Sequence, residues 1–197
     1  NRLENETLFL SYLKDIGVTK VAEPIAVDIE NNLGLFSYLP GVIPKSINDD
    51  IVHQAAEFIR AINESRKHAK EKYLPKASEA SFSVISHLSL VKQRVNRLKQ
   101  IVPNVPIQKE VLAFVRSNLV RSLDQITDDI LNQYSDNQLK RVLPHESRII
   151  SPSDFGLQNM LVKNNTIHFL DFEYSGWDDP AKLICDFGCH PEIPVKK

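Results

Sequence analysis

The stretch IISPSDFGLQNMLVKNNTIHFLDFEYSGWDD, residues 149–179, decides which fold the sequence predicts. Its centre is the pair Asn164-Asn165, which is flanked on both sides by a short apolar run. Asparagine tolerates the positive φ angles that tight hairpin turns demand. We therefore predict a β-hairpin about this pair, in which Met160 lies opposite Phe169.

The open end of this hairpin brings together two side chains that carry oxygen ligands. Asn159 precedes the first strand and Asp171 follows the second. A regular ladder would pair Asn159 with Leu170 and turn Asp171 to the other face, so the site requires the chain to leave the ladder at this end. Magnesium prefers oxygen ligands and usually takes only one or two from protein. The two residues therefore predict a magnesium site.

A third residue, Asp154, lies on the loop before the hairpin. A carboxylate there is free to orient an incoming hydroxyl and to accept its proton, which completes the groups of a kinase-type site. Each of the three residues, taken alone, is equally consistent with capping a turn. Together with the hairpin, they favour a phosphoryl-transfer site.

This segment resembles the aminoglycoside phosphotransferase and choline kinase family, which shares the protein-kinase-like fold. The family's catalytic segment usually reads H-G-D-x-x-x-x-N, followed by a hairpin, I/L-D-F/W-E and G-D-P. Here residues 153–159, SDFGLQN, keep the spacing from Asp to Asn, and residues 170–180, LDFEYSGWDDP, match the second motif nearly throughout. The resemblance implies that Asp154 is the catalytic base, while Asn159 and Asp171 hold Mg²⁺ against the phosphates of ATP.

The first motif departs from the family pattern at two positions. Pro152 and Ser153 stand where the family has His and Gly. That His mainly braces the loop in the kinase fold, so we expect the change to alter how the loop is held more than which groups react.

The N-terminal third supports the same resemblance. Residues 3–16 predict a helix that ends at Gly17. In the family such a helix carries the Glu that pairs with a strand Lys gripping the ATP phosphates, and Glu6 fits this position. A solvated surface Glu is the alternative.

Two strands joined by a turn at Asn31-Asn32 follow, and the second leads into Leu39-Pro40-Gly41. By resemblance this segment is the hinge between lobes, and Ser37, Tyr38 and Leu39 would contact the adenine of ATP. A strand followed by Pro-Gly is also common in other α/β proteins.

Family members place further strands, a phosphate-covering loop and the phosphate-gripping Lys before the Glu helix. Here that helix begins almost at residue 1, and the six glycines form no Gly-x-Gly cluster. We therefore expect a fragment that lacks the first strands and ends in a polar tail, residues 191–197. The predicted domains are a partial N-lobe, residues 1–41, and a helical C-lobe, residues 42–197.

Helical periodicity dominates the segment between hinge and catalytic loop. Apolar stripes at 51–62, 82–98 and 111–130 predict helices that pack into the core of the chain. Four acidic residues follow the third stripe or lie within it, namely Asp124, Asp128, Asp129 and Asp136. A solvated helix face is the ordinary interpretation, and a wall for a cationic substrate is the alternative.

Near the C-terminus, three further features have structural interpretations. Asp178 and Asp179 precede a proline, a step that favours a turn, so we expect both in a loop. Cys185 and Cys189 have no partner ligands at zinc spacing, and packed thiols are expected. His190 is isolated and is interpreted as structural.

Composition limits the class of protein. The chain has 197 residues, a net charge of −1 and 42% hydrophobic residues. Its charge does not indicate a nucleic-acid partner, and no apolar run approaches the roughly 20 residues that cross a bilayer. We expect a cytoplasmic protein without a membrane partner; the sequence does not indicate its oligomeric state.

The sequence as a whole predicts an α+β, protein-kinase-like two-lobed fold with a truncated small N-lobe, a mostly helical C-lobe and a catalytic hairpin. The predicted function is ATP-dependent and magnesium-dependent transfer of the γ-phosphoryl group to the hydroxyl of a small molecule. Aminoglycosides, choline and sugars all remain open as substrates. The alternatives are a nucleotide-binding pseudokinase without transfer activity and a structural helical protein.

Overall fold

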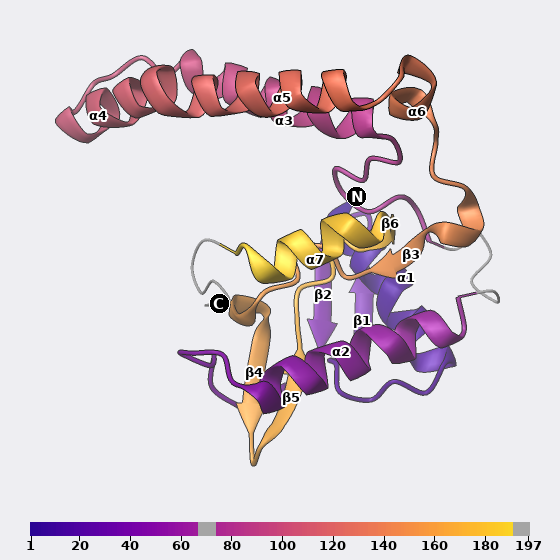
Figure 1. The fold of residues 1–197 in the computed structure, drawn as a ribbon. Helices are drawn as coiled ribbons and strands as arrows, with labels where there is room; N and C mark the ends of the chain where they lie inside the picture. The colour runs from indigo at the N-terminus through magenta and orange to yellow at the C-terminus, as the bar shows by residue number, and fades with distance from the viewer. Residues whose placement is uncertain (67–73, 191–197) are drawn as a thin grey trace. The chain divides into compact units, whose positions relative to one another are not determined.

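The computed structural model describes residues 1–66 and 74–190 (Figure 1). Contacts divide the chain into two compact units: unit 1 is formed by Asn1–Ala80 and His145–Lys197, and unit 2 by Ser81–Pro144. The predicted tail, residues 191–197, lies outside the described residues. The predicted lobe boundary at residues 41 and 42 stays a prediction. The two units are defined by contacts within each unit and do not correspond to the predicted lobes.

The elements follow in chain order. The α-helices are α1 Arg2–Asp15, α2 Asp49–Glu64, α3 Val84–Lys99, α4 Pro106–Phe114, α5 Val120–Gln133, α6 Asp136–Lys140 and α7 Pro180–Gly188. The strands are β1 Pro24–Asp28, β2 Leu33–Phe36, β3 Ile149–Ser151, β4 Met160–Lys163, β5 Thr166–Phe169 and β6 Gly176–Asp178. Shorter turns are the π-helical η1 Val115–Leu119 and the 3-10 turns η2 His145–Ser147 and η3 Leu157–Asn159.

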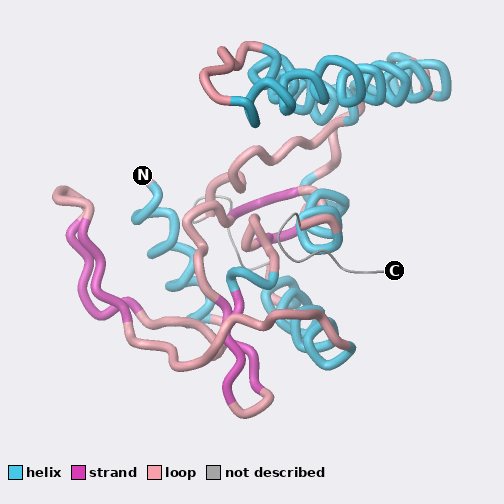
Figure 2. Tube along the Cα trace, turned by 90° about the vertical axis from the view of Figure 1, so that its left-hand side faces the viewer, coloured by secondary structure: helices cyan, strands magenta, loops and turns pink. Residues whose placement is uncertain are grey.

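All described strands belong to unit 1, where they form three antiparallel pairs, β1 with β2, β3 with β6 and β4 with β5 (Figure 2). The β4–β5 hairpin has the predicted register, since Met160 lies opposite Phe169. Asn164 and Asn165 have φ angles of 49° and 60°, which confirms the turn chemistry. The hairpin on which the predicted site depends is therefore formed.

The predicted hinge runs beside this hairpin. After Gly41 the chain pairs with β4 through mutual hydrogen bonds between Val42 and Val162. Gly41 has a φ of 154°, and a Cβ there would lie 2.9 Å from the Cβ of Leu161. The close approach of the two backbones therefore needs a glycine at this position.

A cluster of phenylalanines forms the centre of unit 1. Phe58 of α2 stacks on Phe169 of β5 with ring centroids 4.0 Å apart, and Phe9 of α1 lies 5.1 Å from Phe172. Phe155 stacks on Phe169 at 5.8 Å. All five rings are buried. Since Phe155 follows Asp154 and Phe172 follows Asp171, the core holds the chain at both predicted site carboxylates.

The segment before α7 differs from its prediction. Asp178 is fully buried at the end of β6, and the side chain of Asp179 caps α7 by accepting from the Ala181 amide at 2.8 Å. The expectation of a loop was wrong for Asp178, which ends β6. It holds for Asp179, which connects β6 to α7 and caps the helix, since the Asp-Pro step also marks a helix start. Cys185 and Cys189 are free and exposed, so the expectation of packed thiols was also wrong.

Unit 2 is helical, with α3 and α5 side by side (Figure 1). The first predicted stripe, in α2 of unit 1, is confirmed, because Ile51, Ala55, Phe58 and Ile62 are buried. The third stripe is not one regular helix, since η1 interrupts it between α4 and α5. Moreover, α5 has no buried residue and Ile126 is 54% exposed, so its apolar face does not lie in a core. None of the helices in the described ranges is both long and apolar enough to span a bilayer.

Candidate functional site

Asp154 lies on the loop between β3 and η3, directly after a buried residue. Ser153 is only 4% exposed, whereas the Asp154 side chain is 48% exposed. Both residues have left-handed backbone, with φ angles of 55° and 41°. The amide of Ser153 donates to Ser151 Oγ at 3.0 Å. Two consecutive left-handed residues that are not glycine are unfavourable, so the surrounding contacts must hold this conformation.

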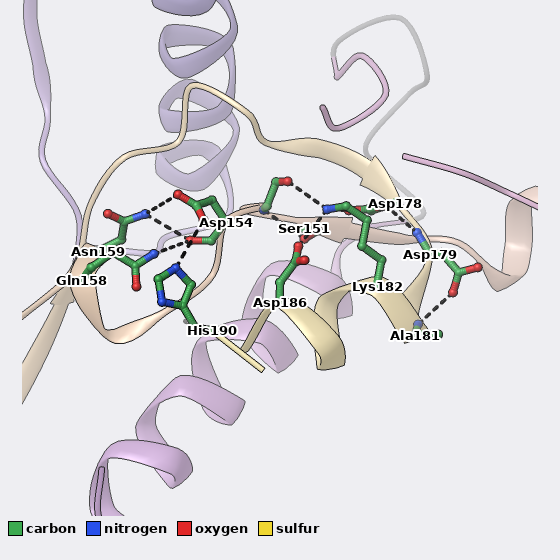
Figure 3. Close-up of polar contacts among 11 residues, drawn as sticks. Ser151, Asp154, Gln158, Asn159, Asp178, Asp179, Ala181, Lys182, Asp186 and His190 are labelled. Carbon is green, nitrogen blue, oxygen red and sulfur yellow. Dashed lines mark hydrogen bonds and ion pairs between the residues drawn. The ribbon is translucent and has the colours of Figure 1, made fainter. Parts of the chain in front are cut away.

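Asn159 ends η3, directly before β4, and its side chain is turned toward Asp154. Its Nδ2 donates to the backbone carbonyl oxygen of Asp154 at 3.0 Å (Figure 3). Gln158 Nε2 donates to the same oxygen at 3.2 Å. Because the amide nitrogen of Asn159 is used in this way, its oxygen is the atom left for a cation.

Asp171 lies where the hairpin ladder ends. The Leu170 amide donates to the Asn159 carbonyl oxygen at 2.9 Å, which extends the ladder by one bond beyond β5. Asp171 then adopts a φ of 63°, so the chain leaves the ladder as the predicted site requires. Tertiary structure therefore brings Asp154, Asn159 and Asp171 to the same end of the hairpin.

Negative charge accumulates at this end. Burial raises the pKa of the Asp171 carboxyl, and the charges of Glu173 and Asp154 raise it further. A carboxylate that is both desolvated and close to like charges favours a bound proton or cation. In the described ranges no group of three or more His, Cys, Asp and Glu side chains has the arrangement of a metal site. One carboxylate and one amide are nevertheless the small oxygen set that Mg²⁺ usually takes from protein.

Glu6 of α1 reaches this group. The Phe172 amide lies 3.5 Å from Glu6 Oε1, the upper limit of a hydrogen bond. Burial raises the pKa of Glu6, and the charges of Asp171 and Glu173 act in the same direction. Glu6 is therefore not a solvated surface residue, and the surroundings favour a cationic partner for it.

The predicted hinge residues make contacts of their own. Ser37 exchanges hydrogen bonds with Glu23, at 2.9 Å in each direction, and the Tyr38 side chain is 86% exposed. In the described part of the chain, no hydrogen bond or ion pair joins Ser37, Tyr38 or Leu39 to Asp154, Asn159 or Asp171. Their role toward adenine stays a prediction.

Residues beside the site include two that were not predicted to lie there. His190 Nε2 lies 3.7 Å from Asp154 Oδ1 (Figure 3). No motif or spacing links these two positions, so only the fold shows their proximity. Lys182 Nζ donates to Ser153 Oγ at 3.1 Å. Here the sequence had a signal, because Asp178, Lys182 and Asp186 are spaced by four residues.

Comparisons with known proteins show the family and the fold of the chain. Residues 1–190 match the profile of the phosphotransferase enzyme family, APH, and the chain belongs to that family. Among solved structures it is similar to choline kinase from Cryptosporidium parvum Iowa II, with a TM-score of 0.54 and 14% sequence identity. The match covers 97% of this chain and 56% of that one, so the chain spans little more than half the length of the choline kinase. No curated protein sequence matches the chain.

The resemblance and the fold class predicted from the sequence are confirmed. The described chain is an α+β structure with small sheets and many helices, and its likeness to the choline kinase shows a protein-kinase-like fold. Family membership supports a phosphotransferase enzyme in general terms. The identities of the nucleotide, the metal and the acceptor are proposed below.

Proposed function

We propose that the protein transfers the γ-phosphoryl group of ATP to a hydroxyl of a small molecule in the cytoplasm. The observation that carries the proposal is the meeting of Asp154, Asn159 and Asp171 at the open end of the β4–β5 hairpin. Membership of the phosphotransferase enzyme family supports it independently.

The residues present fit a magnesium ion. Asn159 offers its amide oxygen because Nδ2 donates to Asp154, and Asp171 offers a carboxylate beside other negative charges. These two residues would hold Mg²⁺. A bound Mg²⁺ would neutralise charge on the phosphates of ATP and help to orient them.

Asp154 has the role of catalytic base in this proposal. Its carboxylate is half exposed, while the backbone on both sides is held by the buried Ser153 and Phe155. A carboxylate in this position can accept a hydrogen bond from the acceptor hydroxyl, orient its oxygen toward the γ-phosphorus and receive the proton. The chain therefore contributes mainly positioning.

Glu6 and the hinge complete the proposed nucleotide site. Glu6 is partly buried among acidic residues, which suits an ion pair with a lysine that binds the ATP phosphates. Backbone groups of Ser37, Tyr38 and Leu39 would receive the adenine.

The test is an assay of the full-length protein with ATP, Mg²⁺ and a panel of hydroxyl compounds that includes aminoglycosides, choline and sugars. We expect ADP release that depends on Mg²⁺ and on one class of acceptor, with phosphate found on that acceptor. Replacing Asp154 by Asn should lower kcat by about 10²-fold or more, because proton transfer by a positioned base contributes that much. Turnover that is unchanged in this variant would contradict the assignment.

Calorimetry with ATP and Mg²⁺, combined with the acceptor assay, distinguishes a phosphotransferase from the alternative of a pseudokinase. The departure at Pro152 and Ser153 is the observation that keeps this alternative open. Magnesium-dependent binding of ATP without phosphorylation of any acceptor would favour it. No binding of ATP with Mg²⁺ would instead favour a structural protein.

A further inference from the structure

A partly buried lysine that contacts the loop of Asp154 has no role in the proposed chemistry. Lys182 lies on α7 and its side chain is only 14% exposed. Its Nζ lies 2.7 Å from Asp186 Oδ2 and 3.0 Å from Asp178 Oδ2 (Figure 3). The same nitrogen lies 3.1 Å from Ser153 Oγ. An ammonium group has three donors, and each is directed to one of these oxygens.

Two of these contacts balance charge, and the third does not. Asp178 is fully buried, and a buried carboxylate needs a partner. Lys182 could neutralise Asp178 and Asp186 without touching the loop. The hydrogen bond to Ser153 is therefore the contact that joins this charged cluster to the residue before Asp154.

The pKa values of Lys182 and Asp178 are both shifted by their surroundings. Burial lowers the pKa of Lys182, but the hydrogen bond to Asp186 and the charge of Asp178 outweigh it, so the pKa is raised overall. Burial raises the pKa of Asp178 more than Lys182 lowers it. The directions agree, because two carboxylates share one ammonium group. Lys182 therefore stays charged at neutral pH and remains a donor to Ser153.

The loop needs such an anchor. Ser153 and Asp154 both have left-handed φ angles, which cost free energy for residues with a side chain. Ser153 is held from two sides, by Ser151 Oγ at its amide and by Lys182 at its hydroxyl. The direction of the Asp154 carboxylate follows from this backbone.

We propose that Lys182 is a positioning residue, which acts through the hydroxyl of Ser153 to hold Asp154 in the orientation that receives the acceptor hydroxyl. This inference rests on the proposed function. The inference predicts an effect on kcat, because the hydrogen bond from Lys182 to Ser153 would orient the proposed catalytic base and not bind the nucleotide.

The decisive variant is Ser153→Gly in the full-length protein. Glycine adopts a φ of 55° more readily than serine, so the variant removes the hydroxyl and relieves backbone strain at once. We expect an unchanged or higher Tm, an unchanged KM for ATP and a kcat about tenfold lower, since small misplacement of a reacting group is costly. A merely structural role would move Tm and leave kcat alone.

A double-mutant cycle tests whether the effect passes through Lys182. If Ser153 acts through Lys182, then Ser153→Ala should lower kcat in the natural background and have no further effect in Lys182→Met. Lys140→Met is the matched control, because Lys140 pairs with Asp136 in the same i,i+4 spacing but is 67% exposed. We expect this control to have unchanged kcat.

The outcomes distinguish the two proposals. No magnesium-dependent turnover of ATP in the unchanged protein overturns the proposed function and, with it, this inference. Turnover that Asp154→Asn abolishes, together with a natural kcat in Ser153→Gly, overturns only the inference. Independent effects of Ser153→Ala and Lys182→Met on kcat also overturn it. If Lys182→Met does not fold, the kcat of Ser153→Gly decides alone.

Discussion

Two groups of carboxylates in this protein have similar composition and very different surroundings. Asp154 and Asp171, with Glu6 nearby, lie where buried phenylalanines hold the chain and the backbone is left-handed. Asp124, Asp128 and Asp129 lie on one face of the regular helix α5 and are exposed. Arg116 and Arg121 line the same surface depression as these aspartates, so opposite charges are interspersed there.

The difference shows what separates a candidate site from a solvated face. On α5 the carboxylates follow from helical spacing alone, and they are exposed to solvent beside two arginines. At the hairpin, packing forces carboxylates together and partly removes them from water. The exposure of the α5 group is compatible with a solvated helix face and also with a wall for a cationic substrate, so both interpretations stay predictions.

The largest expected effect comes from removing the charge of one carboxylate in each group. Asp171→Asn should reduce magnesium-dependent ATP turnover in the full-length protein about a thousandfold or more, because one of the two proposed metal ligands is lost. Asp128→Asn should leave kcat and KM within about twofold, as is usual for surface changes. Steady-state kinetics with circular dichroism as a folding control would measure both. Equal losses in the two variants would remove the distinction between the groups.

The next comparison concerns the packing beneath each group. Phe58→Ala removes a buried ring that stacks on Phe169 at 4.0 Å, and should lower the free energy of unfolding by about 3–5 kcal/mol. Ile126→Ala, at a position that is 54% exposed, should cost less than about 0.5 kcal/mol. Urea unfolding measures both values. A large loss at Ile126 would show that the apolar face of α5 is covered in solution.

A smaller effect is expected from the amide ligand. Asn159→Ala should raise the Mg²⁺ concentration that gives half-maximal turnover about 10- to 100-fold, which is the range for disturbed metal sites. Gln158→Ala is the control, since Gln158 also donates to the Asp154 carbonyl oxygen but is not proposed to bind metal. A magnesium titration at saturating ATP distinguishes them. The same shift in both variants would assign the effect to the shared hydrogen bond and not to metal binding.

The smallest effect tests how the Glu6 helix is held. Tyr12 of α1 donates its hydroxyl to the Ile62 carbonyl oxygen at 2.6 Å, and burial raises the pKa of Tyr12 to about 12 from about 10. Because the folded state binds this proton more tightly, the stabilisation is full below pH 10 and is lost as the pH rises from 10 to 12. Tyr12→Phe should therefore show a flatter fall of Tm over this range than the natural protein. If the curves of Tm against pH are parallel for the two proteins, the pKa of Tyr12 does not differ between the folded and unfolded states.

Much of the site could be predicted because its elements are local. The turn asparagines, the apolar runs and the spacing from Asp154 to Asn159 lie within a short segment, and local pairing determines their register. The interruption of the third stripe by η1 could not be predicted, since an apolar period does not reveal one π-helical turn. His190 was interpreted as structural because it is isolated in the sequence. Its proximity to Asp154 could not be predicted, since it depends on how the chain packs after α7.

The sequence by itself determined the hairpin and the α2 core face, and it predicted the three residues of the candidate site. Only the tertiary structure decided that Glu6 lies near Asp171, that Asp178 is buried and that Lys182 reaches Ser153. The physical reason is the range of the interactions. Turn preference and periodicity act between neighbours in the chain, whereas burial and charge depend on which segments pack together, and that is settled only when the whole core forms.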